Sequence, residues 1–269
     1  MGESDLRLSE AFPPGFKNNN TYHAKVHSFL STLETEIDLE SIEFKKIENE
    51  SELEEIKKLH KEWFPVEYPD AFFREMYGGR YQTLLAIYRA KVLGQKKTET
   101  FILGSITYEV LEIDNNVHQF SIKQLCNQDR GLYIVTFGVV NELRKKGLAG
   151  RLLDQVIQIA KERQNIKYIY LDVVTYNKTA INFYLKHGFR YIYCKENNYL
   201  LFSKWYHAGV YALFLNGGKK AWYSEDYIRC AKKCLRHLNV FSYCRGAYNF
   251  LCKKRMKNPS ANYMAAKLG

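Results

Sequence analysis

The run of residues 132–174 constrains the fold of this chain more than any other part of the sequence. Residues 132–140 are apolar enough for a buried strand, and residues 168–174 form a second strand-like run. Between them, residues 147–163 place apolar side chains at helical spacing, behind a loop that contains basic residues and glycine. A strand, a helix and a strand in succession predict a mixed α/β domain.

The flanking sequence extends the same pattern in both directions. Residues 41–47 alternate like a strand, and the capping box at residues 51–54 predicts a helix that ends before Pro65. We predict a short helix at residues 177–187, and further strands at residues 83–88, 101–110, 189–195 and 209–215. The expected fold class is therefore α/β, with one mixed, twisted sheet. The polar segments at residues 89–100 and 111–131 are expected to be surface insertions.

Charge divides the chain into unequal parts. The 269 residues are 26% charged and 46% hydrophobic, which is typical of a folded protein. The net charge is +11, and residues 219–269 hold 12 Lys or Arg against two acids, so the rest is nearly neutral. We expect a polar extension at residues 1–40, a folded domain at 41–218 and a basic tail at 219–269. An anionic partner should meet the tail.

The sequence shows none of the common signals for export or membrane spanning. No apolar run reaches the roughly 18 residues of a transmembrane helix, and the N-terminus lacks the pattern of a secretory signal. Leu6 stands where a myristoylation motif requires Ser or Thr. The six cysteines are therefore expected to be reduced cytosolic thiols. We predict no metal site.

A basic loop precedes the helix predicted at residues 147–163, and it consists of Arg144, Lys145, Lys146, Gly147, Leu148, Ala149 and Gly150. Free backbone amides at a helix N-terminus bind phosphate, and the helix dipole adds to the attraction. The loop is neither a dinucleotide fingerprint nor a Walker loop. Taken alone, it is equally consistent with an ordinary basic helix start.

Other segments place this loop in a family context. Together with residues 133–139 (YIVTFGV), 169–173 (IYLDV) and 177–184 (NKTAINFY), it resembles the Gcn5-related N-acetyltransferase family in order and spacing. Residues 63–70 (WFPVEYPD) and 215–218 (LNGG) are similar to protein N-terminal acetyltransferases, and among these to a Golgi-anchored member. The resemblance covers residues 42–224 and the character of the tail.

The resemblance implies acetyl-CoA as the co-substrate. The backbone of Phe137, Gly138 and Val139 would pair with the pantetheine arm, and residues 144–150 would hold the pyrophosphate. The alternative for Phe137 and Val139 is that they are core residues.

Two further residues match family positions near the acetyl-CoA arm. Asn177 would contact the arm, and Tyr184 would lie near the sulfur as a proton donor to the leaving thiolate. Each has a structural alternative, because Asn177 also suits a helix N-cap and Tyr184 could pack its helix against the sheet.

The expected catalytic residues are Tyr133 and Asp172. Acetyl transfer needs a neutral amine, and in the resembled family a Tyr and a His assist its deprotonation. Tyr133 matches the first position, whereas Asp172 stands in place of the histidine. Asp172 could be the base, could hold a water or the amine electrostatically, or could be a surface residue while Tyr133 acts alone.

The expected substrate-binding residues are Phe64, Val66, Tyr68, Val135 and Tyr199. The first four resemble the apolar wall for the first substrate residue. Tyr199 is expected on the loop before the last strand, where it would close the site. The family usually has a tyrosine pair there, and Asn198 replaces one of them, so a looser lid is expected.

The tail combines apolar residues at helical spacing with intervening lysines and arginines. A basic amphipathic helix suits an anionic membrane surface. The resemblance places such a tail on the cytosolic face of an internal membrane, the Golgi. The alternatives are a helix docked on the domain and a nucleic-acid contact, and nucleic acid is not the partner we expect.

These observations favour an enzyme that acetylates the N-terminal amine of Met-starting proteins, including membrane proteins with cytosolic N-termini. Acetylation of histone or other lysines is the alternative within the same fold. A catalytically weak acyl-CoA-binding membrane adaptor is the alternative from a different class, and the intact loop and Tyr133 argue against it.

Overall fold

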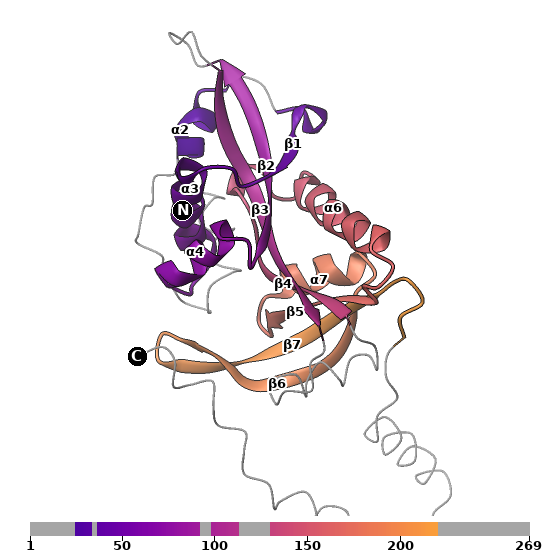
Figure 1. Ribbon diagram of the computed structural model, residues 1–269. Helices are drawn as coiled ribbons and strands as arrows, with labels where there is room; N and C mark the ends of the chain where they lie inside the picture. Colours follow the sequence, from indigo (N-terminus) through magenta and orange to yellow (C-terminus); the bar gives the residue numbers. More distant parts are fainter. Residues whose placement is uncertain (1–24, 34–36, 92–97, 113–129, 220–269) are drawn as a thin grey trace, which may run out of the picture. The chain divides into compact units, whose positions relative to one another are not determined.

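The computed structural model describes residues 25–33, 37–91, 98–112 and 130–219. Within these residues seven strands form a single sheet in the order β1-β2-β3-β4-β5-β7-β6 (Figure 1). Neighbouring strands are antiparallel except β4 and β5, which are parallel. The predicted mixed α/β sheet is confirmed.

The strands are β1 (Glu43–Lys46), β2 (Gln82–Lys91), β3 (Thr98–Glu112), β4 (Arg130–Val139), β5 (Tyr168–Val174), β6 (Arg190–Leu201) and β7 (Lys204–Phe214). The α-helices are α2 (Lys25–Ser31), α3 (Glu50–Trp63), α4 (Asp70–Tyr77), α6 (Leu148–Glu162) and α7 (Lys178–Lys186), and two short 3₁₀ turns, η1 (Leu39–Ser41) and η3 (Asn141–Leu143), complete the set. The strands β2, β3 and β4 extend into both polar segments that we expected to be insertions.

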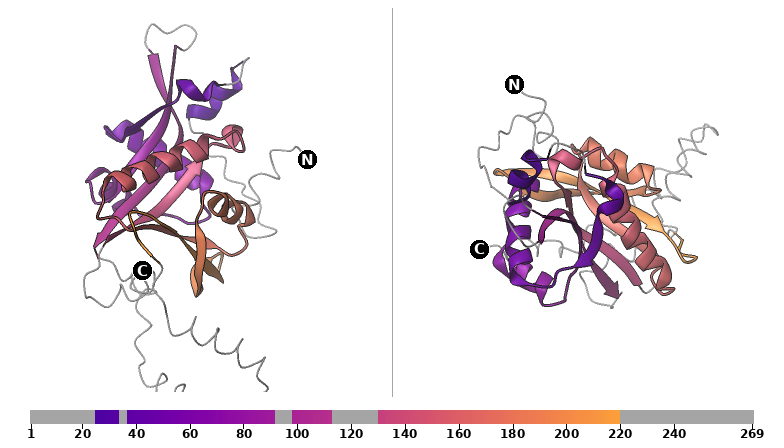
Figure 2. Two further views of the ribbon diagram at one scale, coloured as in Figure 1. Left: turned by 90° about the vertical axis from the view of Figure 1, so that its right-hand side faces the viewer. Right: turned by 90° about the horizontal axis from the view of Figure 1, so that it is seen from above.

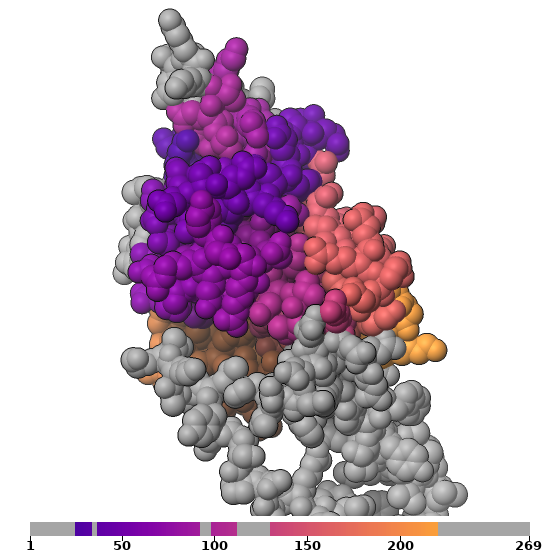
Figure 3. Space-filling model, viewed as in Figure 1, coloured from indigo at the N-terminus to yellow at the C-terminus, as the bar shows by residue number. Residues whose placement is uncertain are grey.

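Helices cover both faces of the sheet. Helices α3 and α4 lie against one face of β2–β4, and α6 lies against the opposite face (Figures 1 and 2). Helices α3, α4 and α6 each bury an apolar stripe; that of α6 comprises Leu148, Leu152, Leu153, Val156, Ile157 and Ala160. The space-filling view shows the indigo and purple surface of α3 and α4 beside the pink surface of α6 (Figure 3).

Helix α3 begins two residues earlier than its predicted capping box. Asn49 is the N-cap, and its side chain accepts a hydrogen bond from the Glu52 backbone N–H at 3.0 Å. The Glu52 carboxylate in turn accepts from the Glu48 N–H. Ser51 therefore lies inside the helix, because Asn49 supplies the better-placed side-chain oxygen. The predicted end before Pro65 is confirmed, since Trp63 is the last helical residue.

Two helices were not predicted. Helix α4 is short and follows Pro69, and it buries Phe72, Phe73 and Met76 against the core. Helix α2 falls in the polar extension predicted at residues 1–40, for which the sequence indicates no helix. His27 of α2 lies 2.7 Å from a Glu62 oxygen and 2.9 Å from a Glu142 oxygen, and these contacts raise its pKa to about 10. The extension thus includes a segment fastened to the domain.

Strand β6 is longer than predicted and contains Tyr199, which we expected on a loop. Lys195 is opposite Ala208 and Tyr199 is opposite Tyr206, so residues 196–198 form a bulge on β6. The polar sequence of this bulge hid the continuing strand. A tight turn with positive φ at Phe202 and Ser203 joins β6 to β7.

The segment 215–218 closes the domain behind α6. The Asn216 side-chain nitrogen lies within 3.1 Å of three carbonyl oxygens at the end of α6, those of Ala160, Arg163 and Ile166. These contacts help to satisfy carbonyls near the end of α6, where a helix leaves its last oxygens without helical partners; the Arg163 carbonyl also accepts from the Ile166 N–H. The motif that contributed to the family resemblance therefore has a structural role here.

The basic tail predicted at residues 219–269 lies outside the described residues, apart from Lys219. Among the described helices, none combines the length and apolar character needed to cross a bilayer.

Candidate active site

The site forms where the two parallel strands separate. Strands β4 and β5 pair only from Gly131 to Tyr133 on β4, against Tyr168 to Tyr170 on β5. Beyond Tyr133, β4 continues to Val139 and remains paired with β3, while β5 continues beside β7. The β5-facing edge of β4 is therefore without a strand partner in the described part of the chain. Its peptide groups can bind an extended ligand in place of a strand.

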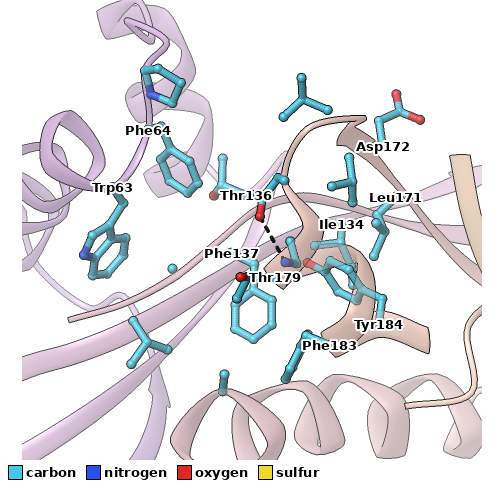
Figure 4. Close-up of a pocket in the computed structure, with 18 of the residues that line it drawn as sticks. Trp63, Phe64, Ile134, Thr136, Phe137, Leu171, Asp172, Thr179, Phe183 and Tyr184 are labelled. Carbon is cyan, nitrogen blue, oxygen red and sulfur yellow. Dashed lines mark hydrogen bonds between the residues drawn. The ribbon is translucent and has the colours of Figure 1, made fainter. Parts of the chain in front are cut away.

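A pocket of about 520 Å³ occupies this opening. Figure 4 shows Trp63 and Phe64 on the side that α3 provides, and Phe183 and Tyr184 on the side that α7 provides. Of the predicted site residues, the pocket brings together Phe64, Val66, Tyr68, Val135, Phe137, Gly138, Val139, Arg144, Lys145, Ala149, Asp172, Asn177, Tyr184 and Tyr199. Tyr133 adjoins it through Asp172, since its hydroxyl lies 3.5 Å from Asp172 Oδ2.

The basic loop has the backbone shape of an anion site. Lys145 and Gly147 have φ of 61° and 101°, and Gly147 is the N-cap of α6 without a side-chain cap hydrogen bond. The first turn of α6 contains no acidic residue. Arg144 Nε donates to the Val139 carbonyl at 3.1 Å, which fastens the loop to the end of β4. The loop can thus present amides and a helix dipole to phosphate.

The loop residues contribute in different ways. Arg144, Lys145 and Ala149 line the pocket, whereas Leu148 buries its side chain in the core and can offer only its backbone N–H. A Cβ on Gly150 would lie 3.2 Å from His187 Nε2, so the glycine allows α6 and α7 to approach. Lys146 and Gly147 do not line the pocket, although Gly147 sets the start of the helix.

Because Gly138 has no side chain, the end of α3 can pack closely against β4. A Cβ at this position would lie 2.1 Å from the Trp63 ring, which shows how closely the indole covers the glycine. Trp63 is 2% exposed, and its Nε1 is buried without a hydrogen-bond partner among the described residues. The predicted role of Gly138 in the pocket is therefore coupled to packing against a residue we did not single out.

Tyr133 of β4, Asp172 of β5 and Lys195 of β6 meet beside the pocket, although β7 lies between β5 and β6 in the sheet. Lys195 Nζ lies 2.7 Å from Asp172 Oδ2, and the Asp172 side chain is only 6% exposed. The prediction that Asp172 could be a surface residue is therefore wrong. The partner lysine was missed, because no sequence pattern links residues 23 positions apart on strands separated by β7.

The tyrosines around the pocket remain protonated at neutral pH. Burial, followed by the charge of Asp172, raises the pKa of Tyr133 well above its usual value, and the pKa of Tyr199 is raised for the same reasons. Burial alone raises the pKa of Tyr184, and raises that of Tyr68 to about 12. These hydroxyls can donate or relay a proton but do not start as phenolates.

A buried histidine supports the aromatic wall. His60 Nδ1 donates to the Ile56 carbonyl at 2.9 Å, and its Nε2 accepts from the Thr136 hydroxyl at 3.1 Å. Burial lowers the pKa of His60 to about 4, so it is neutral. Its ring packs against Phe64 and Tyr68 at centroid distances of 5.2 and 5.6 Å. Sequence reasoning missed His60, since it lies between two residues of a helical stripe and carries no motif.

Asn177 and Tyr184 have the structural roles given above as alternatives, and both also line the pocket. Asn177 is the N-cap of α7, and its side chain accepts from the Ala180 N–H at 3.0 Å. Tyr184 is buried against Phe189, with ring centroids 5.4 Å apart. Both line the pocket, so packing and function do not exclude each other here.

Comparison with known proteins identifies the family. The pattern of the Acetyltransferase (GNAT) family matches residues 53–189. The chain belongs to the GNAT acetyltransferase family. N-alpha-acetyltransferase 60 of Xenopus tropicalis is 30% identical over 181 residues, which cover 66% of this chain and 72% of that protein. Histone acetyltransferase MCC1 of Arabidopsis thaliana is 27% identical over 185 residues, with the same two coverages.

Solved structures give the same result. Crystal structures of Arabidopsis thaliana NAA60, one with a bisubstrate analogue and one with acetyl-CoA, share 26% identity with this chain and superimpose with a TM-score of 0.57. They cover 65% of this chain and 99% of theirs. The protein is thus an acetyltransferase whose acyl donor is acetyl-CoA.

The pocket fits this co-substrate. The unpaired edge of β4 offers peptide groups to an amide-containing arm, and the amides at the start of α6 suit a pyrophosphate. No group of three or more metal-ligating side chains occurs among the described residues.

Proposed function

We propose that this GNAT enzyme transfers the acetyl group of acetyl-CoA to the N-terminal α-amine of Met-starting proteins, with direct attack assisted by Tyr133. One observation carries the proposal: the acetyl-CoA pocket meets an apolar wall at the point where Tyr133 and Asp172 lie. Phe64, Val66 and Tyr68 form that wall. An unbranched apolar side chain such as Met adapts well to it.

The proton chemistry favours an α-amine. An α-ammonium group titrates near pH 8 and a lysine near 10.4, so the α-amine needs less help to become neutral. Tyr133 keeps its own proton because burial and Asp172 raise its pKa. Its hydroxyl therefore orients the amine or a bridging water by hydrogen bonding and, without first being ionised, relays the proton that the attacking amine loses to that water and so to solvent. Attack then requires only the correct placement of amine and thioester.

The other pocket residues have separate roles in the proposed reaction. Bound acetyl-CoA supplies the thioester carbonyl that the amine attacks. The protonated hydroxyl of Tyr184 donates a proton to the departing thiolate, a role that its raised pKa allows. The amides of residues 147–150 hold the phosphates. Tyr199, on β6, bounds the wall at the acceptor side.

A peptide panel tests the proposal. The full chain is supplied with acetyl-CoA and peptides that start with Met-Lys, Met-Val or Ser, or that are N-terminally blocked and contain internal lysines, and CoA release is measured. Release with the free Met peptides, absent with the blocked peptide, is expected. Release with the blocked peptide alone would replace the proposal by lysine acetylation, the activity in the name of the Arabidopsis thaliana relative. Acetyl-CoA binding without any release would favour the adaptor.

We also propose that residues 219–269 attach the enzyme to an anionic membrane surface on the cytosolic side of the Golgi, where membrane proteins with cytosolic N-termini would be substrates. The support is the excess of basic over acidic residues in this segment. A fusion of residues 219–269 to a fluorescent protein should concentrate on Golgi membranes. A diffuse signal would contradict the proposal.

A further inference from the structure

The two carboxylate oxygens of Asp172 have different environments. Oδ2 contacts Lys195 Nζ at 2.7 Å and the Tyr133 hydroxyl at 3.5 Å. Oδ1 is buried and has no hydrogen-bond partner among the described residues. A buried carboxylate oxygen without a donor costs free energy, so its retention calls for a donor from outside the chain. Asp172 lines the pocket, where such a donor can enter.

Lys195 approaches Asp172 from β6 and is not among the residues that line the pocket. The bulge at residues 196–198 leaves Lys195 opposite Ala208, two positions from the residue opposite Asp172, which is Val210. The lysine therefore balances the charge of the carboxylate without occupying the space next to Oδ1. The pair has no net charge.

Within the described part of the chain, the other ionisable groups that interact with the charge of Asp172 are phenols. Tyr133 comes from β4, Tyr170 from β5 and Tyr199 from β6, and β7 contributes Val210 at the paired position. Burial raises the pKa of each of these tyrosines, so they are uncharged between pH 6 and pH 9. Among the described residues that hydrogen-bond to Asp172, Lys195 is therefore the one that carries charge.

Net charge decides how a carboxylate affects a bound amine. A lone carboxylate favours the ammonium form of its neighbour, which has no free electron pair and cannot attack. A carboxylate that is paired with a lysine accepts the same hydrogen bond but supplies little net negative potential. The pair can therefore hold an amine and leave it reactive.

We propose that Asp172 Oδ1 accepts an N–H of the substrate's α-amino group, and that Lys195 is a positioning residue whose charge prevents the carboxylate from favouring the protonated amine. The inference rests on the proposed function, because it takes the acceptor to be an N-terminal amine. In this proposal Asp172 holds the amine by a hydrogen bond and does not remove its proton.

The pH dependence of kcat tests the pair, because kcat reports the ionisations of the enzyme–substrate complex. The full chain and its variants are assayed with saturating acetyl-CoA and a Met-starting peptide from pH 6 to pH 9. Lys195→Met should move the acidic limb of the kcat profile up by about one pH unit, and so lower kcat about tenfold on that limb. The KM for the peptide should not rise.

Variants that change the net charge beside the amine in opposite directions make the test specific. Asp172→Asn should move the limb down and raise the peptide KM, since an unpaired lysine then faces the amine. The double variant Asp172→Asn/Lys195→Met should return the limb close to its original position. Lys195→Arg should leave it in place, and Lys195→Gln, which keeps a hydrogen bond but not the charge, should behave like Lys195→Met.

The controls separate charge from folding. Lys204→Met removes an exposed lysine at the start of β7 and should leave the profile unchanged. Acetyl-CoA affinity and thermal unfolding are measured for every variant. If the limb moves in the same direction in both single variants, or stays in place when Lys195 becomes Gln, the inference is wrong although the enzyme is active. If the unaltered chain releases no CoA with any free N-terminus, the proposed function fails, and the inference fails with it.

Discussion

The acetyl-CoA side and the acceptor side of the pocket are built from different kinds of groups. On the proposed acetyl-CoA side, the groups available for binding are peptide groups: the unpaired edge of β4 and the amides at the start of α6. On the acceptor side, side chains from separate elements meet: Tyr133, Asp172 and Lys195, with Tyr68 supported by His60. One side depends on backbone shape and the other on the identity of individual side chains.

This difference affects what kind of signal each side leaves in the sequence. A backbone site constrains only where glycines and a helix start can stand, and these leave a short local pattern. A side-chain site can change its residues without leaving a recognisable pattern: Asp172, paired with Lys195, stands where the resembled family has a histidine. Substitutions should therefore act differently on the two sides.

The largest effect is expected from adding one carbon to the acetyl-CoA side. Gly138→Ala would place a Cβ 2.1 Å from the Trp63 ring, so that β4 or α3 must move. We expect a loss of stability of about 1–3 kcal/mol, because an added carbon forces the packed segments to shift. Since Gly138 lines the pocket, kcat/KM for acetyl-CoA should also fall about a hundredfold, which corresponds to about 2.7 kcal/mol. Urea unfolding and steady-state kinetics measure both. Gly79→Ala, where no atom lies within 4 Å but φ is 90°, should cost stability through backbone strain alone and leave kcat/KM for acetyl-CoA unchanged, so it separates lost stability from lost binding.

On the acceptor side, removal of a single oxygen should have the next largest effect. Tyr133→Phe removes the hydroxyl 3.5 Å from Asp172 and should lower kcat at least tenfold, which is about 1.4 kcal/mol. Asp172→Asn should cost less in kcat and more in peptide KM, because it holds the amine rather than moving its proton. Acetyl-CoA affinity, measured by calorimetry, should be unchanged in both. Equal and complete loss of turnover in the two variants would contradict this order.

Acid should weaken the acceptor side through His60. Its pKa is lowered to about 4 in the folded protein, whereas an unfolded histidine titrates near 6.5. As the pH falls, His60 is protonated in the unfolded chain before it is protonated in the folded protein. The free energy of unfolding therefore decreases from pH 6.5 down to about pH 4. Between pH 7 and 4.5 the wild type should lose about 2–3 kcal/mol more than His60→Gln. Urea unfolding at both pH values measures this, and parallel losses in the two proteins would contradict it.

The smallest effect is expected from truncating a charged side chain on the acetyl-CoA side. Lys145→Ala removes a cation from the phosphate loop but leaves the amides of α6 in place. We expect acetyl-CoA KM to rise about threefold at low salt, and by less at 0.5 M salt, because screening weakens exposed charges. Lys161→Ala, at the far end of α6, should have no effect. A loss as large as that of Gly138→Ala would show that this side also depends on side chains.

Regular patterns made most of the fold predictable. The apolar run of β4, the stripe of α6 and the strand-like β5 lie where periodicity placed them, and the loop between them is the helix start expected of a phosphate site. Fourteen of the predicted site residues line one pocket, which the family motifs had implied. These features are local, so the sequence around each position is sufficient to indicate them.

The residues that were missed depend on contacts between distant segments. Lys195 is defined by Asp172 across the sheet, and His60 by the Thr136 hydroxyl on β4. The bulge before Tyr199 interrupts the alternation that would have shown β6 to continue. Helix α4 is too short for periodicity to distinguish it from a loop. A single sequence carries no local signal for any of these.

The contact between Trp63 and Gly138 has an evolutionary consequence. The indole of the last residue of α3 rests on the main chain of β4, next to the substrate wall that begins at Phe64. Position 138 can therefore accept a larger residue only after position 63 has become smaller. If position 138 changed first, its side chain would clash with the Trp63 ring. The two positions should change together in lineages that alter either substrate site, and variants at both should be strongly epistatic.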